Sequence, residues 1–291
     1  MESRTLSALL PTVIVPVFNA YQALDACLAS LDRSLPARSP VYLADDASSD
    51  PRVADVLDAW QQRSALAITR VHRVANHGFP GNVNAALAAT APADVVILNS
   101  DTITTTGWLQ RIAACAASDP HIATITPWSN NAEIASFPRF CENNPAPDDA
   151  DMMAQAAATA GTPEYPELPT TMGFCMYLRR AALNACGVFD AATFGRGYGE
   201  ENDLSRRLAA HGWRNVLCDD AYVVHIGNAS FGPLDLGPGG DNLQRLLARW
   251  PDYNERIARF ILSDPLAPLR ARLQRRLDAL ARPRDQGDLF G

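Results

Sequence analysis

Short apolar runs that end in polar residues recur along the first half of the chain. Residues 12–16, 41–44, 67–71 and 95–98 are rich in aliphatic and β-branched side chains, and residue types typical of loops follow each run. Apolar residues at helical spacing come after the first two runs: Leu24, Cys27, Leu28 and Leu31, then Val53, Val56, Leu57 and Trp60. This alternation predicts an α/β protein with a parallel or mixed sheet covered on both faces.

The second half of the chain shows the same kinds of pattern with less regularity. The predicted elements are a helix over 108–117, strands over 122–125 and 172–178, a helix ending at Cys186, a helix over 200–211, and strands over 213–218 and 221–225. Residues 138–169 are rich in proline and acidic side chains, which predicts a long loop with one short helix near 154–160.

The chain becomes rich in Leu and Arg from Asp241 onward, which predicts a helical C-terminal extension over 241–291. Within it, arginines flank a stripe of four leucines: Leu269, Leu273, Leu277 and Leu280. A basic amphipathic helix of this kind lies on an anionic membrane surface, or packs on the rest of the protein or on a second subunit. Residues 283–291 are predicted to be disordered.

Composition and charge exclude some function classes. The formal net charge of −7 gives no basic footprint for nucleic acid, so we expect no nucleic-acid partner. The six cysteines are scattered without a C-x-x-C pair, which favours reduced thiols in the cytoplasm over disulfides. The N-terminal residues resemble neither a signal peptide nor a membrane span. We therefore expect a soluble cytoplasmic protein, with peripheral contact at the inner face of the membrane as the alternative.

Polar side chains gather where the predicted strands end. Asn99 and Asp101 are two residues apart, so in an extended chain they point to the same side, an arrangement that suits a sugar hydroxyl and a divalent cation. The alternative for these residues is a turn or a helix cap, since their types favour both. Asp46, after the second strand, either accepts a hydrogen bond from a nucleoside or caps the next helix. Gly78 and Gly81 allow the backbone to approach a ligand.

These segments together resemble the inverting glycosyltransferases of family 2, which have the GT-A fold, a Rossmann-like mixed sheet flanked by helices. The matching motifs are residues 13–19, Asp45-Asp46-Ala47-Ser48, and Asn99-Ser100-Asp101, where Asn99 replaces the first aspartate of the family's D-x-D motif. The resemblance implies a catalytic domain over 1–240, with a nucleotide-sugar half near 10–127 and an acceptor half near 128–240. It also implies the donor-binding residues Pro16, Phe18, Asn19, Asp45, Asp46, Asn76, Gly78, Asn82, Asn99 and Ser100.

The most specific segment is Gly195-Arg196-Gly197-Tyr198-Gly199-Glu200-Glu201-Asn202-Asp203, where three carboxylates open a helix. Acidic residues at a helix N-terminus are common, but three together repel one another unless a partner relieves them. The resemblance implies that Glu201 is the catalytic base and that Glu200 meets acceptor hydroxyls. Asp203 is left either as the alternative base or as a support that pairs with Arg206 or Arg207.

A histidine ends the last predicted strand, and a lone histidine is commonly a structural donor. The resemblance instead implies that His225 and Asp101 bind a divalent metal, Mn²⁺ or Mg²⁺.

The expected activity is metal-dependent, inverting transfer of a sugar from a nucleotide-sugar donor to a glycan or lipid-linked acceptor in bacterial surface polysaccharide synthesis. A UDP- or dTDP-sugar suits Asp45 and Asp46, and the Gly-Tyr-Gly-Glu-Glu run resembles rhamnosyltransferases, which suggests dTDP-rhamnose. The alternatives are a sugar nucleotidyltransferase and a non-catalytic glycan-binding module on a decayed transferase fold.

Overall fold

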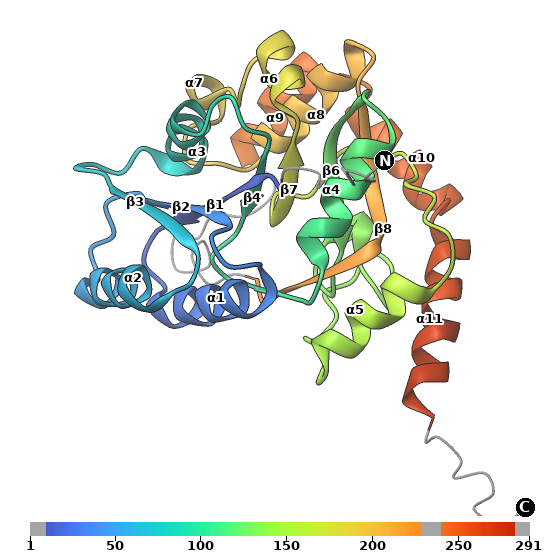
Figure 1. Ribbon diagram of the computed structural model, residues 1–291. Coiled ribbons are helices and arrows are strands. Elements are labelled where there is room, and N and C mark those ends of the chain that lie inside the picture. The colour runs from blue at the N-terminus through green and yellow to red at the C-terminus, as the bar shows by residue number, and fades with distance from the viewer. Residues whose placement is uncertain (1–9, 228–239, 283–291) are drawn as a thin grey trace, which may run out of the picture.

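The computed structural model describes residues 10–227 and 240–282 (Figure 1). Its strands are β1 (Thr12–Val17), β2 (Pro40–Asp45), β3 (Ala67–His72), β4 (Val95–Leu98), β5 (Thr102–Thr104), β6 (Ile122–Trp128), β7 (Cys175–Leu178) and β8 (Arg214–His225). Its helices are α1 (Tyr21–Ser34), α2 (Pro51–Arg63), α3 (Gly78–Ala89), α4 (Trp108–Ser118), α5 (Ala150–Thr159), α6 (Arg180–Cys186), α7 (Ala191–Phe194), α8 (Glu200–Ala210), α9 (Gly240–Arg249), α10 (Tyr253–Ser263) and α11 (Ala267–Ala281), with a 3₁₀ turn, η1, at Glu133–Ala135.

The described strands form one mixed sheet in the order β3-β2-β1-β4-β7-β6-β8-β5. The first four strands are parallel, and β7 is antiparallel to both of its neighbours, β4 and β6. The predicted mixed α/β sheet flanked by helices is therefore confirmed. Because β1, β2 and β4 are parallel, the polar loops that follow them meet at one edge of the sheet.

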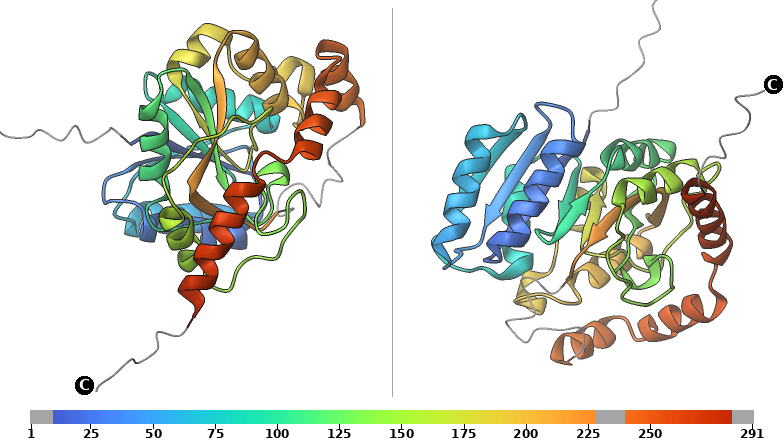
Figure 2. Two further views of the ribbon diagram at one scale, coloured as in Figure 1. Left: turned by 90° about the vertical axis from the view of Figure 1, so that its right-hand side faces the viewer. Right: turned by 90° about the horizontal axis from the view of Figure 1, so that it is seen from below.

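Successive residues of each central strand are buried on opposite faces of the sheet. Val13 and Val15 belong to the core formed with α1, α2 and α4, whereas Ile14 belongs to the core formed with α3, α6 and α8. Figures 1 and 2 show these two helical layers on either side of the sheet. The period of two in β1 thus lets one strand serve both layers.

The first strand continues one residue beyond its predicted end at Pro16. β1 pairs with β4 only over Thr12–Ile14, but it pairs with β2 as far as Val17. Pro16 therefore lies where β1 has a neighbour on one side only, a position at which a missing backbone N–H is tolerated.

The two strands predicted over 213–218 and 221–225 are one strand, β8, so this prediction is wrong. Asp219 and Asp220, which indicated a break, are both buried. The Asp219 carboxylate accepts hydrogen bonds from the backbone amides of Glu164 and Tyr165 and from Arg272. Because this carboxylate has partners from α11 and the preceding loop, the strand can pass through the core without interruption.

The C-terminal helices pack against the rest of the protein. Leu269 and Leu273 of α11 are buried in the main core, and Leu277 and Leu280 pack against its edge. The leucine stripe thus packs on the protein, and α11 lies beside α5 (Figure 2). In the described ranges, no helix has the length and apolar character needed to cross a bilayer. The domain boundary at residue 240 stays a prediction, and residues 283–291 lie outside the described part.

One buried carboxylate ties α8 to the helical extension. Asp203 is 0% exposed, and its Oδ2 accepts a hydrogen bond of 2.8 Å from Arg207 on the next turn of α8. Its Oδ1 accepts bonds of 2.9 Å from both Arg249 and the indole of Trp250, at the end of α9. Arg249 also binds Asp190, which caps α7. Asp203 is therefore the point at which three helices are joined.

Replacing this carboxylate should lower the stability of the whole protein. In Asp203→Ala, two arginines and an indole lose their shared acceptor, and we expect the free energy of unfolding in urea to fall by about 3 kcal/mol. Asp58→Ala removes an exposed partner of Arg70 and is the control, with an expected change within about 0.5 kcal/mol. Equal effects in the two variants would contradict the joining role of Asp203.

Candidate active site

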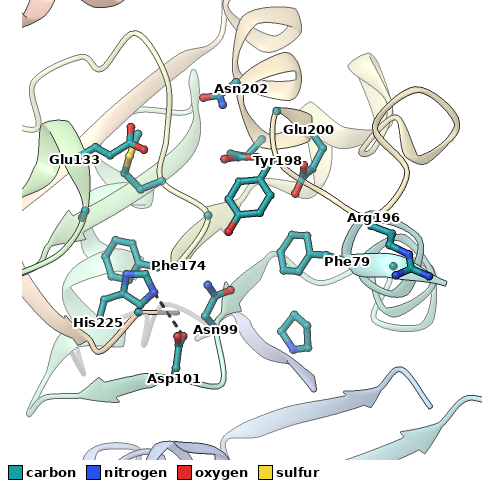
Figure 3. A pocket seen from close by; sticks show the side chains of 18 of the residues that line it. Phe79, Asn99, Asp101, Glu133, Phe174, Arg196, Tyr198, Glu200, Asn202 and His225 are labelled. Carbon is teal, nitrogen blue, oxygen red and sulfur yellow. Dashed lines mark ion pairs between the residues drawn. The ribbon is translucent and has the colours of Figure 1, made fainter. Parts of the chain in front are cut away.

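A cavity of about 720 Å³ opens at the edge of the sheet where the carboxyl ends of β1 and β4 meet the N-terminus of α8 (Figure 3). Of the residues predicted from sequence, the cavity is lined by Pro16, Phe18, Asp46, Asn76, Gly78, Asn82, Asn99, Ser100, Asp101, Glu200, Glu201 and His225. Three do not line it: Asn19, Asp45 and Asp203. Segments far apart in the sequence thus contribute to one site.

Asp46 is the acidic residue that the β2 loop presents to the cavity. It is 3% exposed, and its Oδ1 accepts the backbone N–H of His77 at 2.9 Å. Burial raises the pKa of the Asp46 carboxyl despite this hydrogen bond. Asn76 supports the same loop, since its side chain donates to the Asp46 carbonyl and accepts the N–H of Gly78.

Two predicted donor-binding residues have structural partners instead. The Asp45 carboxylate accepts the N–H of Ser48 at 3.0 Å and lies 2.7 Å from His72 Nδ1 on β3. Asn19 Oδ1 accepts the backbone N–H groups of Ser49 and Asp50, and so joins the β1 and β2 loops. We correct the prediction for both residues: they shape the loops beside the cavity and do not face it.

Asn82 lines the cavity, but its side-chain amide is already bonded within the protein. Its Oδ1 accepts a hydrogen bond of 2.6 Å from Arg73, and its Nδ2 donates to the Ala44 carbonyl at 2.7 Å. The glycine that opens α3 is also required by the protein itself. A Cβ on Gly78, whose φ is +72°, would lie 2.9 Å from the Gly195 carbonyl oxygen. In this structure, the backbone of residues 195–196 makes the close approach to Gly78.

Asp101 and His225 face each other across the cavity floor. His225 Nε2 lies 3.5 Å from Asp101 Oδ1, and Asp101 is 7% exposed (Figure 3). His225 Nδ1 lies 2.7 Å from the Asn131 carbonyl oxygen, which can only accept, so Nδ1 carries the proton and Nε2 faces the cavity. The imidazole ring also stacks on the ring of Phe174, with 5.1 Å between the two ring centroids. The orientation of the imidazole is thus fixed from two sides.

A carboxylate and an imidazole suit Mn²⁺ or Mg²⁺ as hard and borderline ligands. The described residues contain no group of three or more His, Cys, Asp or Glu side chains that could enclose an ion. A metal at Asp101 and His225 would therefore take its remaining ligands from a bound substrate or from water.

Glu200 and Glu201 form a pair of neighbouring carboxyl groups at the N-terminus of α8. Glu200 is 3% exposed, and one oxygen of each carboxyl is buried without a hydrogen-bond partner. Burial, and then the charge of Glu201, raise the pKa of Glu200 well above its usual value. Burial also raises the pKa of Glu201, although backbone amides and the hydrogen bond from Glu200 oppose this rise. Both shifts disfavour a full negative charge on each member of the pair at once.

The loop before these carboxylates has an unusual backbone. Gly195, Gly197, Tyr198 and Gly199 all have positive φ, and Tyr198 is the residue among them that bears a side chain. Asn242 of α9 holds the loop by donating to the carbonyls of Phe194 and Gly197. Tyr198 consequently lies between the Asp101 side and the Glu200 side of the cavity (Figure 3). Its pKa is raised by burial and by the charges of Glu201, Glu200 and Asp101.

Asp203, the alternative candidate for the base, does not reach the cavity. Its carboxylate is fully buried and engaged by Arg207, Arg249 and Trp250. The prediction of a catalytic Asp203 is therefore wrong, and its predicted pairing with Arg207 is confirmed. A carboxylate buried among two arginines and an indole has a structural role and no access to a substrate.

Several lining residues were missed by the sequence reasoning: Phe79, Glu133, Met172, Phe174, Arg196, Leu243, Leu246, Tyr253 and Ile257. Glu133 belongs to η1, shortly after the polar end of β6, and its φ is +45°. The polar end of β6 was the one feature of the nearby sequence that could have indicated Glu133. The four residues of α9 and α10 carried no local signal, because only tertiary packing brings those helices to the cavity.

The fold resembles that of solved glycosyltransferases. The structure of GalNAc-T7 with UDP, GalNAc and Mn²⁺ matches with a TM-score of 0.63 and 15% identity, over 93% of this chain and 55% of the other. TarS of S. aureus in complex with UDP-GlcNAc matches with a TM-score of 0.56 and 14% identity, over 81% and 64%. The mannosyltransferase PcManGT from Pyrobaculum calidifontis, in complex with GDP-Man and Mn²⁺, matches with a TM-score of 0.52 and 18% identity, over 93% and 85%. These likenesses confirm the GT-A fold.

Proteins of similar sequence match most of the chain. Two proteins of Komagataeibacter xylinus, "Putative cellulose synthase 2" and "Putative cellulose synthase 3", are each 26% identical over 228 residues. The match covers 74% of this chain but 14% of each relative, so it concerns one part of much longer proteins. The sequence model of glycosyl transferase family 2 matches residues 12–187, a range that includes β1 to α6 and the Asp101 motif. The chain therefore belongs to glycosyl transferase family 2.

Proposed function

We propose that this glycosyltransferase carries out metal-dependent, inverting transfer of a sugar from a nucleotide diphosphate donor to a hydroxyl group of a glycan or lipid-linked acceptor. One observation carries the proposal: Asp101, His225 and the Glu200–Glu201 pair line a single cavity. Asp101 and His225 lie on one side of it and Glu200 on the other (Figure 3). The solved relatives with UDP, UDP-GlcNAc and GDP-Man support a nucleotide-sugar donor.

The charge of the cavity explains why a metal is needed. Among the described lining residues, carboxyl groups come from Asp46, Asp101, Glu133, Glu200 and Glu201, while Arg196 is the one arginine. A diphosphate would be repelled in these surroundings unless a cation came with it. A divalent ion held by Asp101 and His225 would offset the charge that develops on the departing diphosphate.

The donor would lie with its nucleoside between the β1 and β2 loops. Pro16 and Phe18 supply apolar surface there, and Asp46 supplies a buried carboxylate that can accept the imide N–H of uracil or thymine. Asn99 and Ser100 follow β4 beside Asp101, at the level of the ribose and diphosphate. These contacts favour a UDP- or dTDP-sugar, and dTDP-rhamnose is our specific candidate from the Gly-Tyr-Gly-Glu-Glu run.

Glu201 would be the general base. The acceptor oxygen bonds to the anomeric carbon, its proton passes to the Glu201 carboxylate, and the bond from that carbon to the diphosphate oxygen breaks. The electron pair of the broken bond leaves with the nucleoside diphosphate. A single displacement of this kind inverts the anomeric centre. Glu200 would orient Glu201 and meet acceptor hydroxyls.

Removing the base should separate binding from chemistry. In Glu201→Gln, we expect donor affinity to stay near that of the wild type while the transfer rate falls by about 10²–10⁴-fold. Glu200→Gln is the matched comparison, because it makes the same change at the neighbouring carboxyl and a Gln amide can donate toward Glu201. We expect it to lose much less activity. A larger loss in Glu200→Gln than in Glu201→Gln would reverse the assignment. Single-turnover transfer and calorimetric donor binding measure the two effects.

Removing a metal-facing side chain should abolish the metal dependence of donor binding. Calorimetry with UDP-, dTDP- and GDP-sugars, with and without Mn²⁺, should show a Mn²⁺-dependent gain for one nucleotide. In Asp101→Ala we expect this gain to fall by more than about 100-fold, since even the partners behind metal ligands are worth roughly 10–100-fold. His225→Ala should act in the same direction. His121→Ala, an exposed histidine paired with Asp119, is the control. Unchanged affinity in Asp101→Ala would refute the metal site.

The acid side of the pH–rate profile should respond to Glu133. Transfer requires ionised Glu201, so activity is lost as the pH falls through the raised pKa of that residue. The charge of Glu133 contributes to this rise. Glu133→Gln should therefore lower the pKa of Glu201 and move the acid limb to lower pH. Glu142→Gln, an exposed partner of Arg139 on the same loop, should leave the profile unchanged. A shift to higher pH in Glu133→Gln would contradict the assignment.

A further inference from the structure

The helical extension supplies one wall of the cavity. Leu243 and Leu246 of α9 line it, as do Tyr253 and Ile257 of α10. The members of each pair are three or four residues apart, so they lie on one face of their helix. This wall stands beside the Glu201 side of the cavity, and its side chains are apolar except for one phenol.

The phenol lies at the polar end of this wall. Tyr253 lies near Thr170, and the charges of Glu201 and Glu133 act on its hydroxyl. Burial and these charges keep the hydroxyl protonated, so it can donate a hydrogen bond. A sugar at this point would meet a phenol donor and two carboxyl groups, which together can bind several hydroxyls.

An apolar strip leads away from that point along α10. Tyr253, Ile257 and Ile261 follow one another at four-residue spacing and share one face of the helix. Ile257 lines the cavity, whereas Ile261 is 38% exposed. The strip therefore extends over about 12 Å, from the carboxyl groups toward the solvent. Leu243 of α9, which is 36% exposed, adds further apolar surface at the cavity wall.

We propose that α9 and α10 form the acceptor-binding wall and select an acceptor whose sugar carries an apolar aglycone. The sugar would lie against Tyr253, Glu133 and Glu201, and the aglycone along the α10 strip. This inference rests on the proposed function, because it assigns the acceptor side of the same cavity. The other side of the cavity suits the donor, because it carries the polar residues Asp46, Asn99 and Asp101 and its apolar residues Pro16 and Phe18 are assigned to the nucleoside.

The direct test compares two acceptor probes that differ only in the aglycone. Methyl and octyl glycosides of glucose, galactose, mannose, rhamnose and N-acetylglucosamine are supplied with the nucleotide sugar that binds in calorimetry. The octyl compounds are kept below the concentration at which they form micelles, and the products are followed by mass. For the sugar that is accepted, we expect KM to be at least about ten-fold lower for the octyl glycoside, because its chain leaves water.

Variants of α10 and α9 test which residues cause the preference for octyl glycosides. Ile257→Asn should remove most of the KM difference between octyl and methyl glycosides, and Leu243→Asn on α9 serves as a second variant should the first not fold. Leu262→Asn is the control, since Leu262 is on the same helix, 87% exposed and not part of the cavity. Tyr253→Phe should raise KM for both probes alike, because it removes a contact to the sugar and none to the aglycone.

Two results would overturn the inference, and they are distinguishable. Transfer with equal KM for octyl and methyl glycosides, or an octyl preference that survives both Ile257→Asn and Leu243→Asn, would refute the acceptor wall and leave the proposed function intact. Absence of nucleotide-sugar binding, and of transfer to any glycoside, would refute the proposed function and this inference with it.

Discussion

The buried Asp203 carboxylate is the interaction on which the site geometry depends. It fixes the first turns of α8, where Glu200 and Glu201 are presented, to the end of α9 through Arg249 and Trp250. A buried carboxylate raises the free energy of the folded protein unless hydrogen-bond donors surround it. Separating Asp203 from its partners would therefore cost much of the protein's stability. The same link keeps α9 and α10 against the cavity. One ion-pair cluster thus sets both the position of the carboxyl pair and the shape of the wall beside it.

Local patterns predicted most of the architecture, because strands, helices and their order follow from hydrophobic periodicity. They failed where a long-range partner decides the outcome. β8 passes through Asp219 because Arg272 and two distant backbone amides satisfy that carboxylate. Asp45 and Asp46 are neighbours with the same chemistry, yet His72 engages the first and the second faces the cavity. Nothing within a few residues of either aspartate distinguishes them. The part played by Tyr253 was invisible for the same reason.

The cavity concentrates negative charge in a protein that is already acidic. The chain has a formal charge of −7, and the described cavity lining contains more carboxyl groups than arginines. Such a site is poorly suited to bind an anion directly. It is well suited to bind a cation, to share protons between carboxyl groups, and to receive uncharged hydroxyl compounds. Burial raises the pKa of Asp46, Glu200 and Glu201, and the charge of a neighbouring carboxylate adds to the rise at Glu200 and Glu201.

The hydrogen bond from His225 has a consequence for how this sequence can change over evolutionary time. The acceptor of its Nδ1 proton is the main-chain carbonyl of Asn131, which every amino acid possesses. Substitution at position 131 can alter the cavity rim without deleting the group that fixes the imidazole. Position 131 is therefore free to vary while the histidine keeps its tautomer. A side-chain partner would have coupled these two properties, and each substitution at position 131 would then have put the histidine at risk.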